Sequence, residues 1–395
     1  MRVGIDATCW GSRRGYGRYL RSLLQATLKI DRQNHYTFFA DSDSSEFPLP
    51  EEQVEVIRVP CGTPTVKAAS ADGRRALGDM WAFSRAISSQ KLDLFFFPSV
   101  YSYVPLLGRF PKIVTVHDVI PERFPELVFP TVRSRLNWRA KMKVACAQAR
   151  VILTVSEYSR RCLVEHMGLD SSRLRVVSEA GDPIFQRLEE LNGTALFNKL
   201  GLNANARFVT YVGGFSPHKN LKLLVDVFRE LSSQKGLDVY LLLVGDYEAD
   251  VFHSCYRELK EQVRNSGMEN RVLFTGYIED KDLVTLLNFA EALVLPSFSE
   301  GFGLPAIEAA ACGTPVIATT ESPLKDLLGA GAISVTPNDR AGLLASLKAV
   351  LGDPVRRKAM SEAALAAARE CSWEQSACQL LSVFDEVRKT GGATA

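Results

Sequence analysis

The stretch ALVLPSFSEGFGLPAIEAAACGTPVIAT (residues 292–319) carries the pattern of a βαβ unit. A short apolar run is followed by a loop with two glycines, an alanine-rich helical segment and a second run rich in β-branched residues. Such a strand–helix–strand sequence pairs its two strands in parallel. The stretch therefore predicts a parallel sheet, and it places the loop at the carboxyl end of a strand, where open parallel sheets bind ligands.

The same alternation of strands and helices extends over the whole chain and predicts, for example, helices at residues 19–30 and 220–232. Strands are expected at residues 2–7, 36–40, 54–60, 92–98, 112–118, 150–156, 208–214, 238–246, 271–277, 292–297 and 314–319. Because one domain usually takes about 100–200 residues, the 395 residues predict two α/β domains. We place them at residues 1–190 and 191–371, followed by an amphipathic helix in residues 372–395 that packs back toward the first domain.

The composition is that of a soluble globular protein, with 46% hydrophobic and 23% charged residues. No apolar run reaches the length of a membrane-spanning helix, and the first residues lack the apolar segment of a signal peptide. These features favour a cytoplasmic location. The eight cysteines are scattered without a CxxC pair, which favours reduced thiols and argues against a structural zinc site.

Charge is distributed unevenly along the chain. The first 180 residues hold 26 Lys and Arg against 18 Asp and Glu, and the remainder holds 21 against 27. A basic first half suits an anionic substrate or an anionic membrane surface. Residues 131–150 contain no acid, and Arg135, Arg139 and Lys143 accompany Trp138 there. This indicates either a helix lying on a bilayer, with Trp138 as an interfacial anchor, or a solvated basic face. Nothing in the sequence resembles a base-reading module, which argues against nucleic acid as a partner.

Two carboxylates, Glu300 and Glu308, lie eight residues apart around the loop with the two glycines. Pro305 suits the first position of the following helix, so the backbone amides just before it are expected to point out of a helix N-terminus, which binds anions. A nucleotide sugar offers both an anion for the amides and hydroxyls for the carboxylates. The alternative is an ordinary strand–loop–helix turn with surface glutamates.

The Glu-x7-Glu pattern resembles the donor-binding signature of the retaining family 4 (group 1) glycosyltransferases. YVGGFSPHKNL (211–221) and GYIEDKDLVTLLNFAEALVLPSFSEGFG (276–303) resemble that family's phosphate-binding segment and its run from the base-binding loop to the sugar-binding loop. GYGRYL, TVHDVIPERFP and TVSEYSRR resemble its N-terminal landmarks. The resemblance implies the GT-B fold, in which two Rossmann-like domains face each other across a cleft, and a hexosyltransferase activity that needs neither a metal nor a cofactor.

By this resemblance, the catalytic set is Glu300, His117 and Lys219. Glu300 lies beside the transferred sugar, Lys219 neutralises the leaving diphosphate, and Glu308 binds the ribose hydroxyls. His117 lies over the sugar, although a lone histidine at the end of a strand is more often a hydrogen-bonded structural residue. The donor-binding set is Gly15, Gly17, Gly214, Lys219, Tyr277, Ile278, Glu300, Gly301, Phe302, Gly303, Leu304 and Glu308. Its first two glycines are expected in the loop between the first strand and the first helix.

The chain departs from the family pattern at the phosphate clamp. Many relatives carry an arginine where this chain has Gly214 or His218. His218 would complete the clamp only in its protonated form. Asp41 and Asp43 form a DxD pattern, which metal-dependent glycosyltransferases of another fold use, but we interpret it here as a solvated turn.

The overall pattern is similar to bacterial mannosyltransferases of polysaccharide and O-antigen assembly, which favours GDP-mannose as the donor and leaves UDP-glucose open. The expected acceptor is a saccharide or a polyprenyl-diphosphate-linked saccharide, reached by a peripheral protein on the inner face of the cell membrane. The alternatives are a nucleotide-sugar epimerase of the same fold and a non-catalytic scaffold subunit. A dinucleotide oxidoreductase is disfavoured because no GxGxxG follows the first strand.

Overall fold

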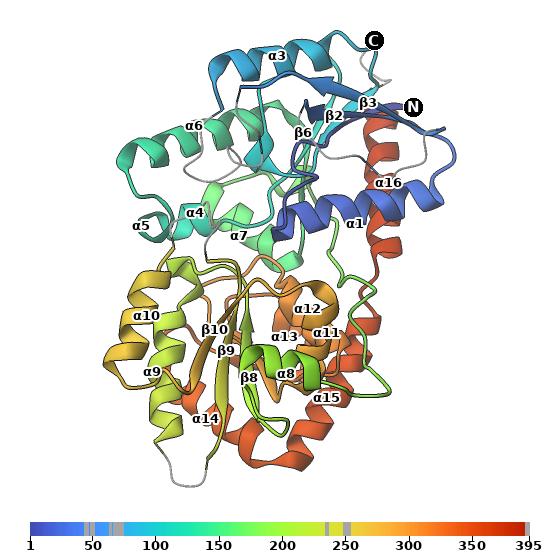
Figure 1. The fold of residues 1–395 in the computed structure, drawn as a ribbon. Helices are drawn as coiled ribbons and strands as arrows, with labels where there is room; N and C mark the ends of the chain where they lie inside the picture. Colours follow the sequence, from blue (N-terminus) through green and yellow to red (C-terminus); the bar gives the residue numbers. More distant parts are fainter. Residues whose placement is uncertain are drawn as a thin grey trace. The chain divides into compact units, whose positions relative to one another are not determined.

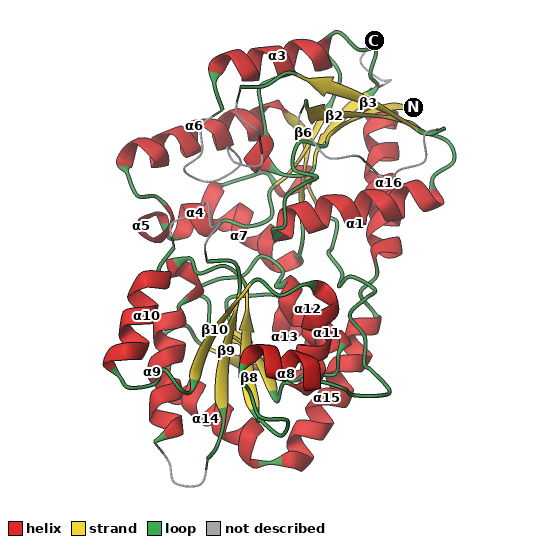
Figure 2. Ribbon diagram, viewed as in Figure 1, coloured by secondary structure: helices red, strands yellow, loops and turns green. Residues whose placement is uncertain are grey.

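The computed structural model describes residues 1–42, 47, 52–62, 65, 75–233, 237–247 and 254–391. The chain divides into two compact units. The first comprises Met1–Glu179 and Ser372–Ala395, and the second comprises Ala180–Cys371. Each unit is built on a β-sheet with helices against it (Figure 1, Figure 2). The chain leaves the first unit after Glu179, ahead of the boundary expected near residue 190.

Within the described residues, the first unit has a parallel sheet of seven strands in the order β3-β2-β1-β4-β5-β6-β7. The strands are β1 (Arg2–Asp6), β2 (His35–Asp41), β3 (Val54–Val59), β4 (Leu94–Phe97), β5 (Lys112–Thr115), β6 (Ala149–Thr154) and β7 (Leu174–Val176). The helices are α1 (Gly15–Ile30), α3 (Leu77–Ser88), α4 (Ile120–Arg123), α5 (Pro125–Val128), α6 (Val132–Gln148), α7 (Glu157–Met167) and α16 (Trp373–Gly391). β4 reads LFFF and is buried at every position, as expected for a central parallel strand covered on both faces.

The C-terminal helix α16 packs within the first unit. The ring of Phe384 in α16 lies 5.9 Å from the ring of Phe96 in β4, measured between centroids. Arg175 of β7 makes two hydrogen bonds to the carboxylate of Glu386, at 2.6 and 2.9 Å. The last helix therefore completes the core of the unit in which the chain began.

The described part of the second unit holds a parallel sheet of six strands in the order β10-β9-β8-β11-β12-β13. The strands are β8 (Phe208–Val212), β9 (Tyr240–Val244), β10 (Val272–Gly276), β11 (Ala292–Leu295), β12 (Val316–Thr319) and β13 (Ala332–Val335). The helices are α8 (Thr194–Leu200), α9 (Leu221–Ser232), α10 (Tyr256–Asn265), α11 (Asp280–Phe289), α12 (Leu304–Ala311), α13 (Leu324–Leu328), α14 (Arg340–Gly352) and α15 (Pro354–Arg369). The βαβ unit expected at residues 292–319 is confirmed as β11, α12 and β12.

In both sheets the strand order reverses beside the first strand of the unit. β1 lies between β2 and β4, and β8 lies between β9 and β11. Open parallel sheets bind ligands at such a reversal, beyond the carboxyl ends of the strands. In the second unit, the segments that follow β8 and β11 carry Lys219 and Glu300, two residues of the expected catalytic set.

Candidate active site

Backbone hydrogen bonds join the loop that follows β11 to the segments that follow β8 and β12. The backbone N–H of Phe298 donates to the carbonyl of His218 at 2.9 Å, which ties the loop to the segment after β8. The backbone N–H of Glu300 donates to the carbonyl of Glu321 at 2.9 Å, which ties it to the segment after β12. Because these hydrogen bonds already order the loop, it loses less conformational entropy when it binds a ligand.

The side chains of Lys219 and Glu300 meet at the strand reversal. Lys219 ends the 3₁₀ turn Pro217–Lys219, and its Nζ lies 2.8 Å from Glu300 Oε1 and 3.0 Å from Oε2. Ser297 donates from Oγ to Oε1 of the same carboxylate at 2.5 Å. Because Glu300 is only 7% exposed, these partners offset the cost of removing its charge from water.

Helix α12 starts at the end of this loop, with Gly303 as its N-cap. Gly303 has a φ of +93°, and a Cβ there would lie 2.9 Å from Leu324 Cδ1, so this position requires glycine. Among the described residues no side chain caps α12. Pro305 has no N–H, and the N–H of Ala306 donates to the carbonyl of Gly303 at 2.8 Å, so the N–H groups of Gly303 and Leu304 are those that the helix start offers to an anion. Pro305 is the second residue of the helix and not the first, as the sequence had suggested. This correction does not alter the expected anion site.

Glu308 lies one turn into α12 and is 4% exposed. The segment that opens the second unit packs against it, because a Cβ on Gly181 would lie 3.7 Å from Glu308 Cγ. The structure therefore brings both expected carboxylates, Glu300 and Glu308, to the start of one helix. Both are buried and neither is a surface glutamate, which contradicts the alternative of an ordinary exposed turn.

The surroundings of His218 disfavour its protonated form. Burial, followed by the positive charge of neighbouring Lys219, holds the pKa of His218 well below its usual value. Its Nδ1 is buried without a hydrogen-bond partner among the described residues. This pKa shift argues against the hypothesis that a protonated His218 replaces the missing arginine of the phosphate clamp. Lys219 is the cation that contacts Glu300 in this loop.

The residues expected to face the base and the phosphates also lie at the carboxyl ends of strands. Tyr277 and Ile278 follow β10, which lies three strands away from β11 in the sheet. At about 4.8 Å per strand, the two loops are about 14 Å apart, which leaves room for an extended nucleoside diphosphate between them. Gly214 follows β8, and its carbonyl accepts a hydrogen bond from Tyr211 Oη at 2.6 Å.

The structure corrects the position of Gly15 and Gly17. Both lie in the first turn of α1, which begins at Gly15, and not in the loop before it. A Cβ on Gly17 would lie 2.2 Å from the carbonyl oxygen of Ser12, so close packing of the helix start against the preceding loop requires this glycine. Packing within the first unit explains Gly17 without a ligand.

His117 follows β5, and both of its ring nitrogens are engaged. Nδ1 lies 3.2 Å from Glu179 Oε1, and Nε2 lies 3.1 Å from the carbonyl oxygen of Pro98. The ring of Tyr19 packs edge-on against the imidazole, with centroids 4.8 Å apart. These contacts agree with a structural role and hold the ring in one orientation at the carboxyl edge of the first sheet. A catalytic role for His117 stays a prediction.

Helix α6 carries its exposed basic residues and Trp138 on different faces. Arg135, Arg139 and Lys143 are exposed and recur every four residues, so they share one face. Trp138 is 5% exposed, and its Nε1 donates to Glu122 Oε1 at 2.7 Å. The expectation that Trp138 anchors the protein in a membrane interface is therefore wrong, because this side chain belongs to the core of the first unit.

Two further charged groups of this region, Glu122 and Lys141, are partly buried. Burial raises the pKa of Glu122 to about 7 and lowers the pKa of Lys141 to about 8. The Nζ of Lys141 donates to the carbonyl of Tyr101. The basic surface of α6 is consequently smaller than the composition of residues 131–150 indicates.

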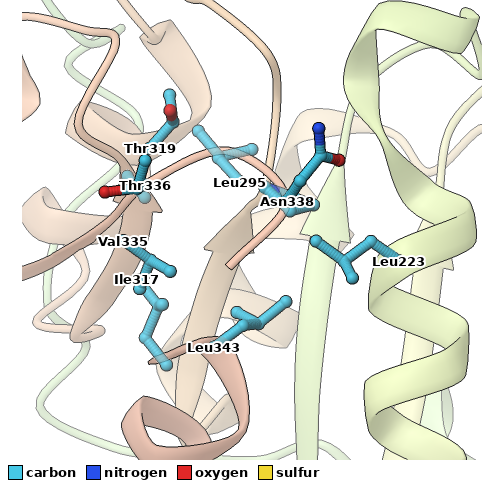
Figure 3. Close-up of a pocket in the computed structure, with 10 residues that line it drawn as sticks. Leu223, Leu295, Ile317, Thr319, Val335, Thr336, Asn338 and Leu343 are labelled. Carbon is cyan, nitrogen blue, oxygen red and sulfur yellow. The ribbon is translucent and has the colours of Figure 1, made fainter. Parts of the chain in front are cut away.

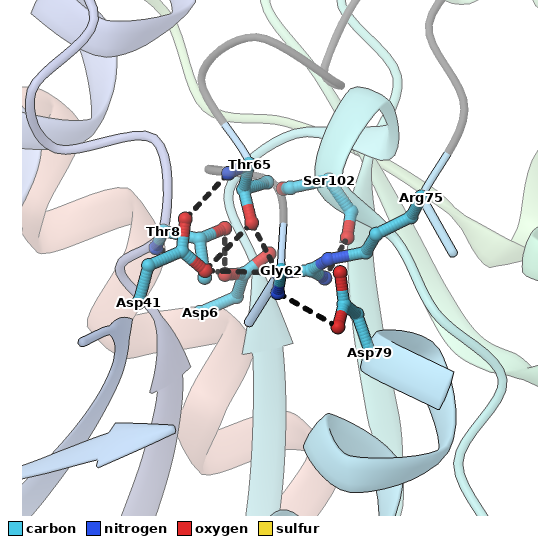
Figure 4. A network of polar contacts seen from close by, with 8 residues as sticks. All are labelled: Asp6, Thr8, Asp41, Gly62, Thr65, Arg75, Asp79 and Ser102. Carbon is cyan, nitrogen blue, oxygen red and sulfur yellow. Dashed lines mark hydrogen bonds and ion pairs between the residues drawn. The ribbon is translucent and has the colours of Figure 1, made fainter. Parts of the chain in front are cut away.

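Asp41 belongs to a buried polar network of the first unit (Figure 4). It is 3% exposed, and its carboxylate accepts a hydrogen bond from Thr65 Oγ1 at 2.8 Å and pairs with Arg75 at 3.2 Å. The interpretation of the DxD pattern as a solvated turn is wrong for Asp41, since this carboxylate is paired inside the unit. Asp43 lies outside the described residues.

The part of the chain that the structure describes shows neither a metal-binding cluster nor a membrane-spanning helix. It has no group of three or more His, Cys, Asp or Glu residues that could hold a metal ion. It also has no helix that is both long enough and apolar enough to cross a membrane.

A cavity of about 10 Å³ lies beyond the ends of β11, β12 and β13 and is lined by Leu295, Thr319, Asn338 and others (Figure 3). It has room for one water molecule.

Ser297 is the residue at this site that the sequence-based set omits. Its hydroxyl contacts Glu300, and the side chain is 0% exposed. The available signal was its position, directly after the proline that ends a strand and three residues before the glutamate. That spacing alone does not reveal the burial that brings the two side chains together.

Two family models match most of the chain between them. "Glycosyl transferases group 1" matches residues 193–366, and "Glycosyltransferase Family 4" matches residues 13–183. Among curated relatives, O-antigen chain mannosyltransferase B of Escherichia coli is 28% identical over 274 residues, which are 69% of this chain and 69% of that protein. D-inositol 3-phosphate glycosyltransferase of Corynebacterium efficiens is 30% identical over 230 residues, which are 57% of this chain and 53% of that protein.

The fold is that of known glycosyltransferase structures. Sucrose-phosphate synthase from Thermosynechococcus elongatus superposes with a TM-score of 0.77 over 99% of this chain and 100% of that chain, at 19% sequence identity. This likeness confirms the GT-B fold with two Rossmann-like domains. The chain belongs to the group 1 glycosyltransferases and carries a family 4 glycosyltransferase domain in its N-terminal half.

Proposed function

We propose that this protein is a retaining hexosyltransferase that moves mannose from a nucleotide sugar to a saccharide or lipid-linked saccharide. The observation that carries the proposal is the contact of Lys219 with Glu300 beside the start of α12, at the strand reversal of the second sheet. A cation, uncapped helical N–H groups and two buried carboxylates are the groups that a nucleotide sugar requires. The second unit then binds the donor, and the first binds the acceptor.

Each part of the donor has a partner of suitable chemistry in this proposal. The diphosphate binds Lys219 and the start of α12, where the helix dipole contributes about half a positive charge. The ribose hydroxyls donate to Glu308, and the hydroxyls of the sugar donate to Glu300. The base lies against Tyr277 and Ile278 at the far side of the reversal.

The reaction breaks the bond between the sugar and the diphosphate and leaves negative charge on the terminal phosphate. Lys219 and the N–H groups of α12 stabilise this charge, so they supply what a divalent metal supplies in other transferases. The acceptor hydroxyl attacks the anomeric carbon from the face that the diphosphate leaves, which retains the configuration. Its proton passes to the departing phosphate.

The names of the two curated relatives support different acceptors. The Escherichia coli relative is called an O-antigen chain mannosyltransferase, which favours GDP-mannose as donor and a growing saccharide on a polyprenyl diphosphate as acceptor. The Corynebacterium relative is named for inositol 3-phosphate, so a small phosphorylated acceptor is the second candidate. The basic exposed face of α6 favours the first, because a lipid-linked acceptor brings the protein to an anionic surface.

Glu308→Ala is expected to weaken binding of a nucleoside diphosphate by about tenfold or more. The substitution removes a charge-assisted hydrogen bond to the ribose, which contributes about 1.5–3 kcal/mol. Isothermal titration calorimetry with GDP and UDP measures the effect. Glu362→Ala, which removes an exposed glutamate of α15, serves as the matched control and should bind like the wild type. Unchanged affinity in Glu308→Ala would remove this residue from the nucleotide site.

The protein is expected to sediment with anionic vesicles and not with neutral ones. Arg135, Arg139 and Lys143 each contribute about 1 kcal/mol near an anionic surface, and salt screens this attraction within about 10 Å. Leu136, which is 58% exposed on α6, adds an apolar contact in place of the buried Trp138.

Replacing those three basic residues with Gln should release the protein from the vesicles while nucleotide binding persists. The control variant replaces Lys348, Arg356 and Lys358 with Gln. These are exposed basic residues of the second unit, so the net charge changes by the same amount. If the wild type ignores anionic vesicles at low salt, the basic face of α6 is a solvated surface and a water-soluble acceptor becomes the better proposal.

A further inference from the structure

The carboxylate of Glu300 is held by two groups of different kinds. Lys219 Nζ lies within hydrogen-bond distance of both oxygens, at 2.8 and 3.0 Å. Ser297 Oγ reaches Oε1 at 2.5 Å. The lysine is a mobile cation on a long side chain, whereas the serine hydroxyl sits on a short side chain that is 0% exposed.

Donor binding is expected to affect these two partners of Glu300 differently. A diphosphate carries more negative charge than a carboxylate, so it draws the ammonium group of Lys219 away from Glu300. The carboxylate, only 7% exposed, would then lose its main partner in a site that water does not freely reach. A buried charge that loses its partner is costly and tends to move or take up a proton.

We propose that Ser297 is the positioning residue that keeps Glu300 in place when Lys219 turns to the diphosphate. The proposal rests on the proposed function, in which Glu300 contacts the sugar and Lys219 contacts the phosphates. By occupying Oε1, the serine fixes the plane of the carboxylate and leaves Oε2 for a sugar hydroxyl. It therefore acts on turnover through Glu300, with no contact to the nucleotide.

The local fold suits Ser297 to this task. It follows Pro296 directly at the carboxyl end of β11, so its backbone is set by the sheet. Asn220, at the start of α9, donates from Nδ2 to the carbonyl of Pro296 at 3.2 Å. The hydroxyl is thus placed by a fixed strand end, three residues before the glutamate that it orients.

Ser297→Ala is expected to lower kcat at saturating donor by about 10- to 100-fold, the loss of one hydrogen bond to a charged group. Affinity for the nucleoside diphosphate should stay within about twofold of the wild type. Ser346→Ala is the matched control: it also removes a buried serine hydroxyl of the second unit, one that donates to the carbonyl of Gly342 within α14. A Ser297→Ala enzyme as fast as this control would overturn the proposal and leave the proposed function intact.

A double substitution separates positioning from general damage to the fold. If Ser297 acts through Glu300, then Ser297→Ala in a Glu300→Gln background should slow turnover no further than Glu300→Gln does alone. A further loss of tenfold or more would mean that Ser297 acts on the enzyme by another route, and the proposal would be wrong.

A crystal structure of Lys219→Ala tests the proposal without any donor. This variant removes the cation, as donor binding does, and leaves the hydrogen bond from Ser297 Oγ to Glu300 Oε1. We expect the Glu300 carboxylate to remain hydrogen-bonded to Ser297 in this variant and to be displaced when Ser297→Ala is added. A carboxylate that swings away in Lys219→Ala alone would refute the proposal, even if the protein turned over no nucleotide sugar.

Discussion

Replacing Lys219 with alanine is expected to lower kcat by about 100-fold or more, because removing one group that stabilises developing charge typically has this effect. In the structure Lys219 contacts Glu300 in the loop that leads to α12, and burial holds the pKa of the neighbouring His218 well below its usual value. With Lys219 and α12 carrying the phosphate charge, wild-type activity should persist in EDTA. Initial rates at saturating nucleotide sugar, with and without the chelator, measure both effects.

Lys222→Ala provides the control for Lys219→Ala. Lys222 is an exposed lysine in the first turn of the following helix, so its loss changes the net charge equally without touching Glu300. It should turn over donor at the wild-type rate. Complete loss of activity in EDTA, restored by Mn²⁺ or Mg²⁺, would contradict the metal-independent mechanism.

Glu300→Gln is expected to reduce turnover by about 100-fold and to leave binding of the nucleoside diphosphate unchanged or tighter. The amide keeps the shape of the side chain but loses the charge that interacts with the reacting sugar. It also releases Lys219, whose Nζ is now shared between both carboxylate oxygens, so the cation becomes freer to bind phosphate. Parallel measurements of kcat and of the dissociation constant for GDP and UDP separate the two effects.

Glu362→Gln, at an exposed position of α15, is the matched control for this substitution and should behave as the wild type. Near-normal turnover by Glu300→Gln at saturating donor would remove Glu300 from the catalytic set. A loss of nucleoside diphosphate binding that is as large as the loss in rate would assign the residue to nucleotide recognition instead.

The sequence predicts most of the fold because the buried parallel strands are continuous apolar runs. LFFF in β4 and ALVL in β11 are buried at every position and need no context to be recognised. Among the strands that the structure describes, the sequence does not predict β7 and β13, which lie at the edges of their sheets. β7 has three residues, and no residue of β13 is fully buried, so neither leaves an apolar run.

For the candidate site, the sequence predicts the start of α12 to within one residue but does not predict which side chains are buried. Glycines, the proline and the spacing of the two glutamates are visible in the sequence and mark the start of α12. Whether Trp138 faces solvent or the core depends on Glu122, which comes from another helix. The protonation of His218 likewise depends on burial that local sequence does not encode.

The central claim is that the protein transfers a sugar from a nucleotide donor. The most direct measurement is release of nucleoside diphosphate by the purified wild-type protein over a panel of nucleotide sugars that includes GDP-mannose and UDP-glucose, with Lys219→Ala as the inactive control. We predict release from GDP-mannose, with mannose passing to an added saccharide or, slowly, to water, and little release by the control. A nucleotide sugar that is epimerised while its bond to the diphosphate stays intact, or no release from any donor in the panel, would contradict the claim.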